Sequence, residues 1–121
     1  MSDVVTERII GAAIEVHRTF GAGLLESVYE AALCHEMSLI GIPFQRQVRL
    51  DVHYKGSVIA QQVLDIVVDK SVIVELKSVQ HLPDIATAQI LSYLKATGLE
   101  RGLLINFSAP RLVQGIKRFS L

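Results

Sequence analysis

Two neighbouring apolar runs of this sequence carry three charged side chains, Asp65, Glu75 and Lys77. The first run spans residues 63–68 and the second spans residues 72–77. Runs this apolar are typical of strands that are buried on both faces of a sheet. A charge inside such a sheet is costly in free energy unless it is paired or binds a metal ion. The three charges therefore indicate chemistry rather than a contribution to stability.

The spacing of these charges brings them together if the two runs form a hairpin. Glu75 and Lys77 are two residues apart, so their side chains project from the same face of a strand. A three-residue loop centred on Lys70 would place Asp65 directly opposite Glu75, and the Cβ atoms of opposed residues are roughly 5 Å apart. Two carboxylates at that distance can share one divalent cation. A two-residue turn would direct Asp65 to the other face, so the prediction requires an odd-length loop or a bulge.

Hydrophobic periodicity predicts the element order α-α-β-β-β-α-β, with helices able to cover both faces of the sheet. The predicted elements are helices over residues 3–19 and 25–40, strands over 47–54, 58–68 and 72–78, a helix over 82–97 and a strand over 102–107. The strand over 58–68 is predicted to contain a bulge at Gln61-Gln62. Gly98 is the predicted stop of the third helix. Residues 110–116 are predicted as a short helix, and 117–121 as an edge strand or tail.

Length and composition restrict the class of protein. The 121 residues suit one domain, 1–121, with a sizeable core. Half of the residues are apolar, but no uninterrupted apolar stretch approaches the roughly 20 residues of a membrane span. The polar start, Ser2-Asp3, does not resemble a secretory signal. The single cysteine, Cys34, excludes an internal disulfide, fits a reducing cytoplasm, and is expected to be a buried structural thiol.

The charge balance argues against indiscriminate binding of nucleic acid. The formal net charge is zero, and tight non-specific binding depends on neutralising phosphates. The charge is nevertheless uneven, because five basic residues follow position 94 against the single acid Glu100: Lys95, Arg101, Arg111, Lys117 and Arg118. This tail is either a solvated surface, which is the default interpretation, or a surface that contacts phosphates.

Three further residues are candidates for a site. Glu26 begins the second helix, where an acid is also favoured by the helix dipole alone. Gln89 and Tyr93 are four residues apart on the third helix and therefore share a face. That helix follows the Glu-x-Lys strand after a short loop, so its first turns return towards the end of the strand. Tyr29 is predicted to be a core residue, and His81 is a weaker candidate for contact with a substrate.

The charged residues of the two apolar runs resemble a known motif. Asp65 followed by Glu75-x-Lys77 is similar to the core of the PD-(D/E)XK nuclease superfamily. The resemblance extends over nearly the whole chain, from about residue 9 to residue 119. One departure is that Leu64, rather than proline, precedes Asp65, but the acid is the chemical requirement.

Two more motifs lie in the expected order around this core. Gly23-x-x-Glu26-x-x-Tyr29 resembles the signature of the GxxExxY proteins. Gln89-x-x-x-Tyr93 resembles the QxxxY motif that several exonuclease branches of the superfamily carry after the core. These two motifs and the two parts of the core, Asp65 and Glu75-x-Lys77, make four motifs in the expected order, each on the expected element, and together they indicate the family.

The resemblance implies a restriction-endonuclease-like α/β fold with a mixed four-stranded sheet, and metal-dependent hydrolysis of DNA or RNA. Asp65, Glu75 and the Leu76 carbonyl would bind Mg²⁺ or Mn²⁺. Lys77 would orient or help to deprotonate the attacking water and stabilise developing charge. Glu26 would complete the metal shell or hold a water of the metal. Two further side chains would position the site groups or the scissile phosphate: Gln89 and Tyr93.

Two alternatives remain open at this point. The charges Asp65, Glu75 and Lys77 could form a structural network of ion pairs, although such networks are rare in strands this apolar. The domain could also be a non-catalytic module that uses the nuclease fold to bind nucleic acid or to assemble. Specific DNA interfaces bury roughly 1,000 Å² or more of protein surface, so a core this small predicts a homo-oligomer or a partner protein.

Overall fold

The structure, a computed structural model, describes residues 3–121, which form three α-helices, a short 3-10 helix and one five-stranded sheet. In chain order the elements are α1 (Val4–Phe20), α2 (Glu26–Leu39), β1 (Phe44–Tyr54), β2 (Ser57–Val68), β3 (Val72–Lys77), α3 (Asp84–Thr97), β4 (Arg101–Asn106), the 3-10 helix η1 (Leu112–Gly115) and β5 (Ile116–Ser120). The strand order is β1-β2-β3-β4-β5, and only β3 and β4 are parallel.

The fold has the predicted α/β architecture, with corrections to the sheet. Four strands were expected in the sheet, and the described residues contain five, because the segment expected as an edge strand or tail forms a strand, Ile116–Ser120, that pairs antiparallel with β4. The short helix expected over 110–116 is a single 3-10 turn at Leu112–Gly115. The strand expected from residue 47 begins earlier, at Phe44. None of the helices in residues 3–121 is both long and apolar enough to cross a membrane.

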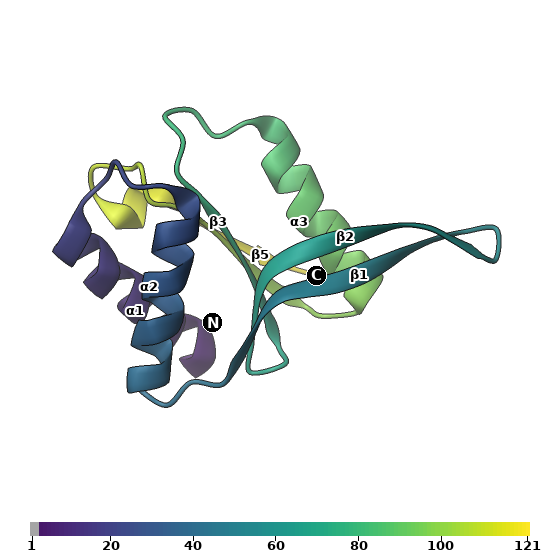
Figure 1. Ribbon diagram of the computed structural model, residues 1–121, viewed down its shortest axis with the longest axis horizontal. Helices are drawn as coiled ribbons and strands as arrows, with labels where there is room; N and C mark the ends of the chain where they lie inside the picture. The colour runs from purple at the N-terminus through teal and green to yellow at the C-terminus, as the bar shows by residue number, and fades with distance from the viewer. Residues whose placement is uncertain (1–2) are drawn as a thin grey trace.

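The sheet separates two apolar cores. Helices α1 and α2 lie on one side of the sheet and α3 lies on the other (Figure 1). The larger core joins α1 and α2 to side chains of β2, β3 and β4, and the smaller core lies beneath α3. Cys34 is buried in the larger core, where burial raises the pKa of its thiol to about 11. The prediction of a structural thiol is therefore confirmed.

Local signals account for the helix ends. Asp3 caps α1, because its carboxylate accepts a hydrogen bond from the Thr6 N–H at 2.9 Å. Gly98 ends α3 as predicted, with a left-handed φ of 75° and its N–H bonded to the Leu94 carbonyl. Each helix begins and ends within about two residues of its predicted bounds.

The β1–β2 hairpin extends as an arm beyond the rest of the molecule (Figure 1). Its irregularity differs from the prediction. Gln61 and Gln62 pair regularly with Asp51 and Leu50, so no bulge occurs there. The register instead shifts between Val52 and His53, which leaves Ile59 as the extra residue on β2.

Candidate active site and metal centre

The hairpin between β2 and β3 has the three-residue connection that the sequence predicts, residues 69–71. Backbone pairing runs from the turn to Ile66 opposite Val74. The next two residues in this register are Asp65 and Glu75. The odd-length loop therefore places the two carboxylates across from each other, because a register set by the turn also sets the face of each side chain.

Each of the two acids accepts a hydrogen bond from a backbone N–H group of the opposite strand. The Asp65 N–H donates to Glu75 Oε1 at 3.0 Å, and the Leu76 N–H donates to Asp65 Oδ2 at 2.9 Å. Carboxylate oxygens thus replace backbone carbonyls where the pairing of β2 and β3 ends. The N–H and C=O groups of one strand residue point to the same side. The Leu76 carbonyl therefore faces the side on which Asp65 lies.

A twist in β2 places Asp65 at the junction of the two sheet faces. Ile66 packs in the core beneath α1 and α2, whereas Leu64 packs in the core beneath α3. Residues two apart on a regular strand share a face, so the strand turns over at Asp65. On the paired strand β1, Gln47 has a φ of 51°, in the left-handed region that few non-glycine residues adopt. This local irregularity interrupts the β1–β2 ladder at Asp65 and leaves Asp65 half-buried beside the start of α2.

Electrostatic repulsion at the pair suits a divalent cation. Burial, and after it the charge of the Asp65 carboxylate, raise the pKa of Glu75 to about 8, against the lowering effect of Lys77. No three His, Cys, Asp or Glu residues within 3–121 lie close enough together to hold a metal ion. The atoms that face this place, two opposed carboxylates and a backbone carbonyl, are all oxygen, the kind of ligand that Mg²⁺ and Mn²⁺ prefer. The residues present fit the metal that the sequence predicts.

Glu26 lies beside this pair, at the first position of α2. It lines a cavity of about 390 Å³ together with Asp65 and Glu30. Burial raises the pKa of Glu26; Lys77 lowers it, and Asp65 and Glu30 raise it. The charges of Asp65 and Lys77 therefore act on Glu26 at close range. The structure brings Glu26, from a helix near the N-terminus, to the same place as the acids of the hairpin.

Tyr93 approaches the carboxylates from the other side of the sheet. Its side chain is 7% exposed and packs in the core beneath α3. Burial raises the pKa of its hydroxyl, and the charges of Glu75 and Asp65 raise it further. Gln89 lies one turn earlier on α3 and is exposed to solvent. Contact of Gln89 with a substrate stays a prediction.

A model of the PD-(D/E)XK nuclease superfamily matches residues 3–119. The chain belongs to this superfamily. The crystal structure of SSO0001 is similar in fold, with a TM-score of 0.52 at 15% sequence identity, over 98% of this chain and 78% of that chain. Comparison with curated proteins finds no significant match.

Membership of the PD-(D/E)XK superfamily agrees with the α/β architecture and with the expectation of a nucleic acid substrate. Asp65, Glu75 and Lys77 lie on the paired strands β2 and β3, at the end of the hairpin remote from the turn. The superfamily is generally dependent on divalent metal ions. The oxygen-rich pair described above is consistent with that dependence.

Tyr29 anchors the turn that precedes Glu26. It is completely buried, as predicted, and stacks on Phe107 with ring centroids 4.4 Å apart. Its hydroxyl donates to the Gly21 carbonyl and accepts from the Leu24 N–H. A core aromatic ring with a polar end thus orients the start of α2.

Two residues that position the site are missed by sequence reasoning. Glu30 is 7% exposed and accepts hydrogen bonds from Arg46 at 2.9 Å and from Gln47 at 2.8 Å. Its signal is the i, i+4 spacing from Glu26, which places both acids on one helix face. The Ser78 hydroxyl donates to the Leu24 carbonyl at 2.7 Å. That bond ties the end of β3 to the start of α2, and nothing in the local pattern indicates it.

Proposed function

We propose that this protein is a metal-dependent nuclease, a hydrolase that cleaves phosphodiester bonds of DNA or RNA. The observation that carries the proposal is the opposed pair Asp65 and Glu75, with Lys77 two residues further along the same strand, in a chain of the PD-(D/E)XK superfamily. The family match over residues 3–119 supports treating the chain as one nuclease domain. The GxxExxY branch is the proposed subfamily, on the placement of Glu26 beside the hairpin acids.

Asp65, Glu75 and the Leu76 carbonyl would hold Mg²⁺ or Mn²⁺. When bound, the cation supplies charge neutralisation at the phosphate and a nucleophile at neutral pH. The Glu75 carboxylate must lose its proton to act as a ligand. Since its pKa is raised to about 8 by burial and by Asp65, metal binding and proton release at this residue are coupled.

The remaining side chains act on the water and the phosphate. Lys77 projects from the same strand face as Glu75, so its ammonium group would orient the attacking water and stabilise charge that develops on the phosphate. Glu26 would accept a hydrogen bond from the same water, because it lines the cavity that Asp65 also lines. Tyr93 would donate a hydrogen bond at the carboxylates, and Gln89 would contact the substrate near them.

Self-association is part of the proposal, and the β1–β2 arm supports it. The arm exposes large apolar side chains at its far end and along β2: Tyr54, Val58, Ile59 and Val63. The outer edge of β1 has no strand neighbour among the described residues, because β1 ends the sheet. Exposed apolar groups beside an open edge favour pairing with a second copy. A dimer would supply the larger surface that gripping a nucleic acid requires.

The second candidate function is a non-catalytic module that binds nucleic acid or assembles on the nuclease fold. The zero net charge and the small size support it. A cytoplasmic location belongs to both candidates and is supported by the single buried thiol of Cys34.

The deciding experiment is cleavage of end-labelled single-stranded and duplex DNA and RNA in the presence of Mg²⁺ or Mn²⁺. Lys77→Ala is expected to lower the cleavage rate by about 10²–10³-fold, the range for removal of one transition-state donor. Lys95→Ala, an exposed lysine on α3, is the matched control and should cleave as the wild type does. Absence of cleavage of every substrate by the wild type would favour the non-catalytic module.

A further inference from the structure

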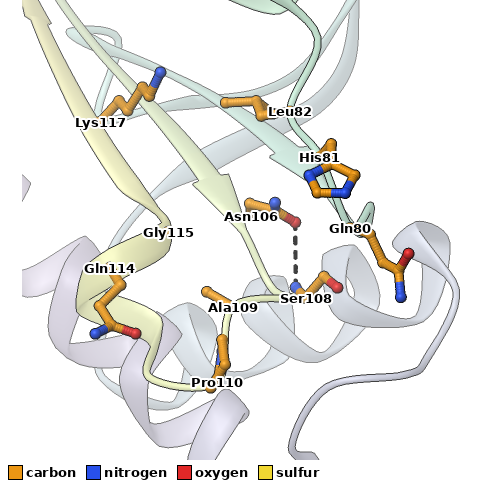
Figure 2. A pocket seen from close by; sticks show the side chains of 10 residues that line it. All are labelled: Gln80, His81, Leu82, Asn106, Ser108, Ala109, Pro110, Gln114, Gly115 and Lys117. Carbon is orange, nitrogen blue, oxygen red and sulfur yellow. Dashed lines mark hydrogen bonds between the residues drawn. The ribbon is translucent and has the colours of Figure 1, made fainter.

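A second polar pocket lies on the side of β3 that is opposite to β2, next to β4 and β5 (Figure 2). Its volume is about 440 Å³, and its walls are the loop between β3 and α3, the end of β4, and the η1–β5 segment. The polar side chains that line it are Gln80, His81, Asn106, Ser108, Gln114 and Lys117. It shares no lining residue with the cavity that contains Glu26 and Asp65.

The walls of this pocket are held in place by specific contacts. The Asn106 amide donates to the Val79 carbonyl at 2.9 Å and accepts from the Val79 N–H at 3.2 Å, and its oxygen also accepts from the Ser108 N–H (Figure 2). On another wall, His17 Nε2 bonds to the Ala109 carbonyl at 2.9 Å. A Cβ added at Gly115 would lie 2.4 Å from the Asn106 carbonyl oxygen. The pocket is therefore preformed.

The charge of the pocket favours an anion. Lys117 supplies a basic side chain and His81 supplies ring nitrogens that can donate hydrogen bonds, and none of the described residues that line the pocket is acidic. Lys117 takes part in none of the salt bridges found within residues 3–121. Its neighbour Arg118, in contrast, pairs with Glu7 of α1 at 2.7 Å. Because side chains alternate along β5, Arg118 points to the face of the sheet covered by α1, and Lys117 points to the opposite face.

Strand register relates this pocket to the carboxylates. Lys117 is paired with Leu104 on β4, and Leu104 is paired with Glu75 on β3. Paired residues project from the same face of a sheet, so Lys117 and Glu75 belong to one row. Their backbones are two strand spacings apart, or about 10 Å. One row further along, Lys77 is paired with Asn106, whose side chain forms part of the pocket wall.

We infer that this pocket binds a backbone phosphate of the nucleic acid strand whose cleavage is proposed above. The inference rests on the proposed function. Lys117 supplies the charge, and His81 and Gln114 supply hydrogen bonds to the phosphate oxygens. Because the two backbone positions are only about 10 Å apart, the bound phosphate lies close to the scissile bond along the same strand and sets its register.

The test is equilibrium binding without catalysis, by fluorescence anisotropy of labelled single-stranded and duplex oligonucleotides in EDTA. Lys117→Gln is expected to lower the affinity about tenfold at low salt, as loss of a charged hydrogen bond does. The slope of log K against log salt should fall in magnitude by about 0.7 for single strands and about 0.9 for duplexes. Arg118→Gln removes the same charge one residue away, on the face of the sheet towards α1. It should change the affinity and the salt slope much less than Lys117→Gln does.

His81→Ala is the second variant. It should weaken binding but change the salt slope less than Lys117→Gln does.

Oligonucleotides with and without a terminal phosphate distinguish the source of the bound group. An equal loss of affinity for both kinds in Lys117→Gln indicates an internal phosphate, and a loss confined to the phosphorylated strand indicates a terminal one. Wild-type binding that Lys117→Gln leaves unchanged, or that Arg118→Gln weakens equally, refutes the pocket while leaving the nuclease proposal intact. Failure of the wild type to bind any oligonucleotide in EDTA refutes the pocket, and cleavage in the presence of Mg²⁺ or Mn²⁺ then tests the nuclease proposal separately.

Discussion

Replacement of Glu75 by glutamine is expected to stabilise the metal-free protein at neutral and alkaline pH. Glu75 is 8% exposed, and its carboxylate faces that of Asp65. Burial and then this like charge raise the pKa of Glu75 from 4.5 to about 8. The glutamine side chain has the same shape and keeps the oxygen that accepts the Asp65 N–H. It therefore removes the ionisable group without opening a cavity or leaving a donor unpaired.

The pH dependence of the effect follows from proton linkage. Below pH 4.5 the carboxyl group of Glu75 is protonated in both the folded and the unfolded chain, so its ionisation does not affect stability. As the pH rises from 4.5 to about 8, the unfolded chain releases this proton and the folded chain retains it. The free energy of unfolding then falls by about 1.4 kcal/mol per pH unit. The loss is about 3 kcal/mol at pH 7 and is complete above the folded-state pKa.

Urea unfolding of the wild type and Glu75→Gln in EDTA, followed by circular dichroism at pH 4.5, 6 and 7.5, measures this difference. The two proteins should have nearly equal free energies of unfolding at pH 4.5, and the variant should gain steadily as the pH rises. Glu100→Gln, at an exposed glutamate, is the control and should show no such trend. A variant that is several kcal/mol less stable than the wild type at pH 7.5 would refute the reasoning. It would instead indicate that Glu75 is stabilised by an ion pair with Lys77.

Two other predictions concern the metal and the anchor of α2. Mn²⁺ at about 100 times its Kd should raise the free energy of unfolding by about 2.7 kcal/mol. The effect is measured as a rise in melting temperature, which Asp65→Ala should abolish. An equal rise in that variant would show that the ion binds elsewhere. Tyr29→Phe should lower the free energy of unfolding by about 1–3 kcal/mol, because the Leu24 N–H and the Gly21 carbonyl lose their hydroxyl partner. An unchanged urea midpoint for Tyr29→Phe would contradict that role.

Much of the site can be predicted from the sequence because it depends on local pairing. Opposition of Asp65 and Glu75 needs only two apolar strands and a three-residue turn, and alternation along β3 adds Lys77. The helices are equally local, since periodicity and residues such as Gly98 set their extent. Burial of Tyr29 also follows from its apolar neighbours.

Tertiary structure decides the features that depend on residues distant in the chain. Ser78 reaches Leu24 across 54 positions, and Glu30 meets Gln47 only because α2 packs beside the irregular part of β1. The fifth strand forms because β4 offers an open edge to residues 116–120, and this pairing turns Lys117 towards the second pocket. Composition and periodicity describe each segment by itself, whereas the partner of a strand edge or of a buried polar group is set by packing of the whole chain.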